Sequence, residues 1–185
     1  MHFERITGPA EEPVTLTEAK AHLRVVDDSE DTLIAMLITA AREHCEDVAR
    51  RTFVTQTYAL TLDNWPDKPL ALPLPPVAGI TSIVYTDDNG NVATLATSVY
   101  VLDGGKLFVA PNQSWPSTSL RQYAGVKVTY TAGYGDAADV PSKYKQAVLL
   151  TLGHWFQNRE AVVVGTSAKE LPLAAKALLM TDRGY

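Results

Sequence analysis

The side chains that most often carry enzyme chemistry are few in this 185-residue chain, and they are spaced far apart. No two histidines form an H-x-x-x-H or H-E-x-x-H pair, the spacing that puts two imidazoles on one helix face around zinc. His44 adjoins Cys45, but neighbouring helical residues point about 100° apart and rarely share a metal ion. We therefore expect no metal site. The four histidines are His2, His22, His44 and His154.

Patterns for nucleophilic attack and for phosphate binding are also missing. Cys45 falls on the apolar face of a predicted helix, where free cysteine behaves as a small hydrophobic residue. Gly133-Tyr134-Gly135 lacks the third glycine and the lysine of a phosphate-binding loop, so it is interpreted as a turn. Asp27-Asp28 fits a helix cap and Asp87-Asp88 fits a turn. The chain is predicted not to be an enzyme, with no catalytic residue and no cofactor.

The composition is that of a globular protein with an acidic balance. Hydrophobic residues make up 46% and charged residues 20%, and 16 Lys+Arg against 21 Asp+Glu give a net charge of −5. This balance disfavours a nucleic-acid binder, which normally collects phosphates with a basic stripe. No window approaches the roughly 20 apolar residues of a membrane span, and no signal peptide is visible. We expect a protein made in a cytoplasm, whose single cysteine forms no internal disulfide.

Two helical patterns follow a Pro-interrupted segment, residues 1–14, that is expected to be an extended arm. Thr15-Leu16-Thr17-Glu18 is typical of a capping box, which predicts a helix to about Arg24. Asp27 and Asp28 are expected to cap a second helix ending near Arg51. Its polar side is expected to hold Asp31, Arg42, Glu43, Glu46 and Arg50, with Glu46 and Arg50 paired four residues apart. Its apolar side recurs at helical spacing: Ile34, Leu37, Ile38, Ala41, Cys45 and Val48.

Between residues 55 and 131 the period changes to two, which is typical of half-buried strands. Asn89-Gly90 and Asp103-Gly104-Gly105 predict hairpin turns, because their residues accept positive φ angles. The region is therefore predicted to form a small antiparallel sheet or barrel. The expected strands cover 55–62, 70–74, 80–85, 99–102, 106–109 and 126–130.

Two further helices are expected within residues 141–180. The first, from about Pro141 to Asn158, is apolar on nearly every side, and a neighbouring subunit could supply part of its burial. The second is about ten residues long, marginal alone, and must dock on this chain or on another. Partner contact and intramolecular core are both open for these residues. The predicted subunit or partner contacts are Tyr144, Leu149, Leu152, Trp155, Phe156, Leu171, Leu173, Leu178 and Leu179.

Segments spread over most of the chain resemble the phage head–tail connector family, also described as head-completion or adaptor proteins. Their order and spacing carry the resemblance, which runs from about Pro13 to Arg183. The segments are LTEAKAHLR (16–24), AARE (40–43), TQTY (55–58), LPLPPV (72–77), ITSIVY (80–85), VTYTAGY (128–134), VP (140–141), KQA (145–147), HWFQNRE (154–160), LP (171–172) and ALL (177–179).

The resemblance implies a structural adaptor at the neck, the head–tail interface of a tailed-phage virion. Such proteins form a closed ring of about a dozen copies below the portal protein, in which two different surfaces of each copy meet. The ring extends the DNA channel and docks the next neck or tail protein. The implied partners are further copies of the chain, the portal and a downstream stopper or tail protein. DNA would pass without sequence-specific binding, and no membrane is implied.

The expected fold class is α+β, with a helical-bundle core made of the two N-terminal and the C-terminal helices. A small antiparallel β-sheet or barrel would be inserted into it. We expect one adaptor domain over residues 1–185, with N-terminal helices in 15–51, the β region in 55–131 and C-terminal helices in 141–180. The alternatives are another neck or tail structural protein, such as a stopper or tail terminator, and a small α+β enzyme or binding domain.

Overall fold

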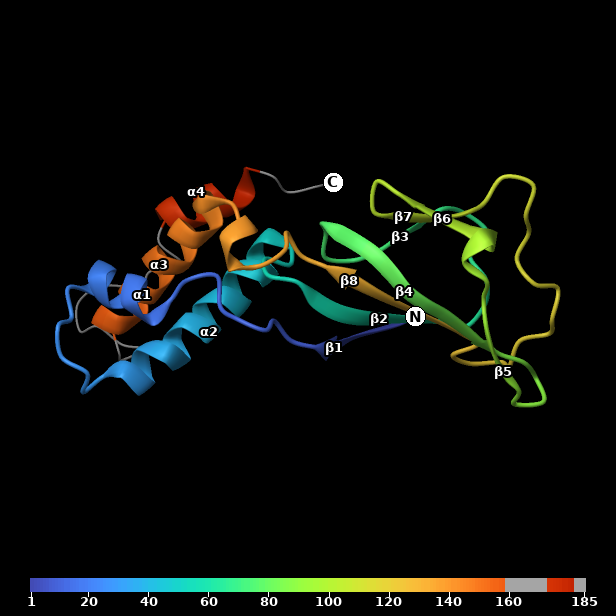
Figure 1. The fold of residues 1–185 in the computed structure, drawn as a ribbon, viewed down its shortest axis with the longest axis horizontal. Coiled ribbons are helices and arrows are strands. Elements are labelled where there is room, and N and C mark those ends of the chain that lie inside the picture. The colour runs from blue at the N-terminus through green and yellow to red at the C-terminus, as the bar shows by residue number, and fades with distance from the viewer. Residues whose placement is uncertain (159–172, 182–185) are drawn as a thin grey trace. The chain divides into compact units, whose positions relative to one another are not determined.

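The chain alternates between two compact units. The computed structural model describes residues 1–158 and 173–181 (Figure 1). Met1–Ala10 and Thr55–Gly133 form one unit, here called the sheet unit. Glu11–Val54 and Tyr134–Tyr185 belong to the other, here called the helical unit. Each unit has its own hydrophobic core, and each is described by itself.

The sheet unit contains two antiparallel sheets. One has the strand order β1-β2-β8-β4-β5 and the other the order β3-β7-β6. A short 3₁₀ helix, η1 (Thr97–Val99), precedes β6. The strands are β1 (His2–Thr7), β2 (Gln56–Leu62), β3 (Leu70–Ala71), β4 (Val77–Thr86), β5 (Val92–Thr94), β6 (Tyr100–Asp103), β7 (Lys106–Val109) and β8 (Val126–Ala132).

The period-two pattern of the central strands explains the core of this unit. Leu60 on β2 lies opposite Val128 on β8, and Val128 lies opposite Ile83 on β4. All three side chains are fully buried, because alternate residues of neighbouring strands share one sheet face. Tyr130 is buried on the same face, and its hydroxyl donates a hydrogen bond to the Pro73 carbonyl at 2.8 Å.

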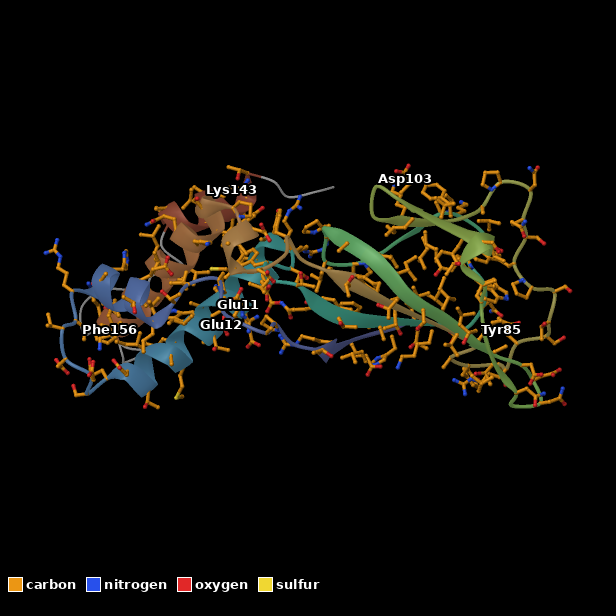
Figure 2. The ribbon with its side chains drawn as sticks, viewed as in Figure 1. Glu11, Glu12, Tyr85, Asp103, Lys143 and Phe156 are labelled. Carbon is orange, nitrogen blue, oxygen red and sulfur yellow. The ribbon has the colours of Figure 1, made fainter. Side chains whose placement is uncertain are left out.

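The structure corrects the prediction for the N-terminal segment and locates the two predicted turns. His2–Thr7, within the predicted arm, instead forms edge strand β1, paired with β2. The predicted turn after Asp103 is confirmed, because Gly104 and Gly105 adopt φ angles of 53° and 75° between β6 and β7. Asp103 marks this turn in Figure 2. The turn at residues 87–91 is longer than two residues, since Asp87 accepts hydrogen bonds from the backbone N–H groups of Asn89 and Asn91.

The helical unit contains α1 (Leu16–Leu23), α2 (Asp31–Ala49), α3 (Ser142–Gln157) and α4 (Leu173–Met180), with the 3₁₀ helix η2 (Ala137–Asp139) before α3. α3 packs against each of the other three helices. Phe53, just after α2, stacks on Tyr144 of α3 with ring centroids 4.7 Å apart. The core of the helical unit thus joins residues that come before and after the sheet segment Thr55–Gly133.

A buried ion network ties α2 to the segments before and after it. Arg42 is only 2% exposed. Its Nε donates to Glu12 and its Nη1 to Glu46, at 2.8 and 2.7 Å. The other oxygen of Glu46 accepts the backbone N–H of Phe53 at 2.7 Å. Burial alone would lower the pKa of Arg42, but Glu46 and Glu12 outweigh it and raise that pKa. Figure 2 shows Glu12 beside α2.

The two N-terminal helices begin differently from one another. The predicted capping box of α1 is confirmed: Glu18 N–H donates to the Thr15 hydroxyl at 3.2 Å, and Thr15 N–H donates to Glu18 at 2.7 Å. The predicted cap of α2 is wrong. Glu30 occupies the cap position without a side-chain bond, while Asp27 accepts from Ser29 and Asp28 accepts from Lys20.

Thr15→Ala is expected to lower the free energy of unfolding by about 1 kcal/mol, because it removes the hydroxyl that accepts the backbone N–H of Glu18 in the first turn. Urea unfolding followed by far-UV circular dichroism measures the change. Thr17→Ala is the matched control: Thr17 is exposed within α1 and has no capping role, so its effect should stay within about 0.5 kcal/mol.

The pH dependence of this effect gives a second check. Hydrogen bonds from the backbone and hydroxyl of Thr15 lower the pKa of Glu18 below 4.5. Stability from a lowered carboxyl pKa is present above the unfolded value and is lost as pH falls through the folded value. The difference between wild type and Thr15→Ala should therefore shrink below about pH 4.5. A pH-independent difference would contradict the role of the Glu18 carboxylate.

The prediction of a helical-bundle core carrying an inserted sheet is wrong. Within the described residues, eight strands in two antiparallel sheets accompany four α-helices, which makes a mixed α+β fold. The sheets enclose their own core, including Leu60, Ile83 and Val128. They also recruit β1 from the N-terminus, so they are not simply an insertion between helices. Helical periodicity in the sequence correctly predicted the helices. It carries no information on whether the strands bury a hydrophobic core of their own.

Candidate partner-contact surface

The predicted contact residues of α3 divide into buried and half-buried side chains. Tyr144 and Leu152 are fully buried inside the helical unit, so they have no surface to offer a partner in this structure. Leu149, Trp155 and Phe156 are half-buried and pack around the edge of the core. Figure 2 labels Phe156 in the helical unit. On α3, these three remain the predicted contacts that a neighbour could reach.

On α4 the predicted residues also lie on two sides. Leu179 is 1% exposed and packs into the core, while Leu178 is half-buried. Leu173 points outward and is 85% exposed. Leu171 lies outside the described residues. The predicted partner contact for these positions stays a prediction, and Leu173 is the most accessible member of the predicted set.

The outward side of α4 is apolar along its whole length. Leu173, Ala174, Ala177 and Met180 are exposed, and we call these four residues the α4 outer face. Lys176 is the one polar side chain in the helix sequence LAAKALLM, and it is half-buried. A helix on a protein surface usually presents charged and polar residues to solvent, so the apolar outward side makes α4 a candidate contact surface. Ala174, Ala177 and Met180 are not among the predicted contacts, although the near absence of polar residues in the helix sequence was a usable signal for them.

The groups considered for chemistry have structural positions. Cys45 is buried in the helical core, which confirms its interpretation as a core residue. Burial raises the pKa of its thiol to about 11, so the thiol stays protonated at neutral pH. In the described ranges, no three His, Cys, Asp or Glu side chains lie close enough together to hold a metal ion. No helix of the described chain is long and apolar enough to span a membrane.

The described residues thus form a mixed α+β chain whose helical unit presents an apolar helix side to solvent. Residues 12–169 match the model of the head completion protein family. Because the match covers most of the chain, the chain belongs to the head completion protein family. This confirms the predicted resemblance and the role of a structural head–tail connector.

Solved structures support the same fold. A chain of the virion of a native gene transfer agent (GTA) particle matches with a TM-score of 0.79 and 21% identity, covering 97% of this chain and 93% of that one. A chain from the neck of the empty GTA particle, computed with C6 symmetry, gives 0.78 and 23% with the same coverage. One from the neck of the native particle, computed with C12 symmetry, gives 0.75 and 21%, again with that coverage. No curated protein matches the chain.

Proposed function

We propose that this chain is the adaptor of a phage-like particle, assembled as a ring of about a dozen copies in which each copy uses two different surfaces. The ring would lie below the portal protein, extend the DNA channel and dock the next neck or tail protein. The observation that carries the proposal is the family match over residues 12–169. The solved neck structures with the same fold, to which C6 or C12 symmetry was applied, support a ring arrangement.

The α4 outer face supports a docking role for the C-terminal helix. It adds three exposed apolar residues to Leu173, so the predicted contacts of α4 extend along the helix. On α3, the half-buried Leu149, Trp155 and Phe156 are the residues proposed to meet a neighbouring subunit or the portal. We propose that the two units act together as one adaptor domain.

We further propose that the protein performs no chemical step. Its buried thiol is protonated at neutral pH, and the buried ions of the helical unit are engaged in a structural network around Arg42. The net charge of −5 suits a channel wall that lets DNA slide, because an acidic surface does not neutralise phosphates.

The test is assembly. The purified chain is analysed by light scattering and electron microscopy, alone and after mixing with the portal protein of the same particle. We expect rings of about a dozen copies, either free or formed only on the portal, as symmetric closure predicts. A chain that stays monomeric in both conditions and does not bind the portal would overturn the proposal.

A further inference from the structure

Asn89-Gly90, in the turn between β4 and β5, is the one place in the chain where an asparagine is followed by a glycine. Asparagine is a thermolabile residue, because the next backbone nitrogen can attack its side-chain amide. A glycine has no Cβ, so its nitrogen approaches that amide with the least steric hindrance. Asn89 and Gly90 are both exposed, so water reaches them. The other asparagines, which precede larger residues, are Asn64, Asn91, Asn112 and Asn158.

The reaction at such a pair needs no catalyst and no cofactor. The Gly90 nitrogen loses its proton and bonds to Cγ of Asn89, while the bond from Cγ to Nδ2 breaks and Nδ2 leaves as ammonia with that proton. Water then opens the cyclic imide at one of its carbonyl carbons, which gives aspartate or isoaspartate. No atom is oxidised or reduced. Either product adds one negative charge, which takes the net charge from −5 to −6.

The turn holds Asn89 in a geometry that disfavours this attack. Gly90 N–H donates to the Asp87 carbonyl at 3.1 Å, and Asp87 N–H donates to the Asn91 carbonyl at 3.0 Å. Asp88 and Asn89 have negative φ angles and Gly90 has a φ of 86°, which is the pattern of a type I turn followed by a left-handed glycine. Asn89 is the third residue of this turn, where ψ is about 0°. The Gly90 nitrogen therefore lies toward the backbone nitrogen of Asn89 and away from its Cγ.

The carboxylate of Asp87 fixes this turn. One of its oxygens accepts the backbone N–H groups of Asn89 and Asn91, at 3.0 and 2.7 Å. The other oxygen accepts Nδ2 of Asn91 at 2.8 Å. The reacting amide is held as well, because Nδ2 of Asn89 donates to Asp88 at 2.9 Å. Figure 1 shows the turn where β4 passes into β5.

We propose that Asn89 is a site of spontaneous deamidation that the closed turn between β4 and β5 keeps unreactive, so that the reaction proceeds when this turn opens. Folded chains open locally at a lower free energy than they unfold globally, and a slow reaction then follows the population of the open form. This turn is a candidate for such opening because it is exposed and because β5 pairs with β4 through three residue pairs only.

The modification would make the opening permanent. In isoaspartate the main chain runs through Cβ and Cγ of the former Asn89, which lengthens the backbone before Gly90. The bond from Gly90 N–H to the Asp87 carbonyl and the pairing of Asp87 with Asn91 could not then form together in the register described above. The inference goes beyond the ring and the portal contact proposed above and depends on neither.

The test follows the asparagines of the purified full chain during incubation at mildly alkaline pH, in buffer and in guanidinium chloride. Peptide mapping by mass spectrometry measures the fraction of each asparagine converted to aspartate and isoaspartate. In denaturant, Asn89 should convert faster than any other asparagine, because Asn89 alone precedes a glycine. In buffer, its conversion should be at least about tenfold slower than in denaturant, as for a turn that is mostly closed.

Asp87→Ala tests the turn itself. Its loss of side-chain hydrogen bonds should raise the rate at Asn89 in buffer at least about fivefold and leave the rate in denaturant unchanged. Asp103→Ala is the matched control: Asp103 is an exposed aspartate at the other hairpin turn of the sheet unit, so both rates should stay as in wild type. Circular dichroism shows whether each variant is folded. Asn91→Ala, which removes only the side-chain bond to Asp87, replaces Asp87→Ala if that variant does not fold.

Three results would overturn the proposal. The first is an equal rate at Asn89 in buffer and in denaturant, which would mean that the turn gives no protection. The second is a rate in buffer that the folded turn variant does not raise, or that Asp103→Ala raises equally. The third is faster conversion of another asparagine in denaturant, which would mean that Asn89 is not the most reactive site.

Discussion

Arg42→Ala is expected to destabilise the helical unit by about 3–5 kcal/mol, the largest effect of any single substitution considered for this protein. The guanidinium is 2% exposed and links Glu12, before α1, to Glu46, which also holds the N–H of Phe53. Its removal leaves the buried Glu46 carboxylate without its cation, and an uncompensated buried charge has this order of cost. Urea unfolding at pH 7, followed by circular dichroism, measures it.

Glu43→Ala is the control for this prediction. Glu43 contacts the same guanidinium at 3.4 Å, but its side chain is 44% exposed, so the pair should contribute less than about 1 kcal/mol. Arg42→Lys keeps the charge but cannot reach two carboxylates as a fork, so an intermediate loss is expected. Equal free energies of unfolding for Arg42→Ala and Glu43→Ala would show that the ion network around Arg42 does not stabilise the helical unit.

Leu173→Glu combined with Ala177→Glu is expected to abolish ring assembly or portal binding while leaving the fold intact. Both residues are exposed on the α4 outer face, so the folded unit should change in stability by no more than about 1 kcal/mol. Two carboxylates in an apolar contact would have to lose their hydration without a partner, which opposes association strongly. Light scattering with portal, together with a thermal melt, separates the two effects.

A double variant elsewhere controls for added charge. Ser117→Glu with Thr118→Glu introduces the same two carboxylates on an exposed segment of the sheet unit. Assembly should be unaffected in this variant. If both double variants lose assembly, net charge is responsible; if neither does, the α4 outer face is not a contact surface.

Local patterns predicted most of the helices and strands. The apolar spacing of α2 and α3 and the alternation of β2 and β8 each report which side of an element is buried, and these need only neighbouring residues. The capping box of Thr15 and Glu18 and the turn at Gly104-Gly105 were predicted for the same reason. The sequence predicted Leu173 as a contact residue. It did not predict Ala174, Ala177 or Met180, the other three residues of the α4 outer face.

Features set by distant parts of the chain were not predictable. Arg42 and Glu46 were assigned to the polar side of α2, and Glu46 was expected to pair with Arg50. In the structure Glu46 pairs with Arg42 instead, and both are buried, with Arg42 also bonded to Glu12 and Glu46 to the backbone N–H of Phe53. Strand β1 joins a sheet whose next strand begins at Gln56, so its pairing depends on contacts across about fifty residues. The division into two units follows from such contacts.

The interleaving of the two units along the chain sets an order for their formation during synthesis. A ribosome releases β1 to β8 before it has made α3 or α4, so every strand of the sheet unit is available while the helical unit lacks half of its helices. Domains generally fold as units, with the earlier-completed one first. Until α3 emerges, α1 is the one described α-helix already made beside α2, and the core that contains Ile34, Ile38 and Cys45 stays incomplete. The nascent chain is therefore most exposed to aggregation or chaperone capture in the interval between the completion of β8 and that of α3.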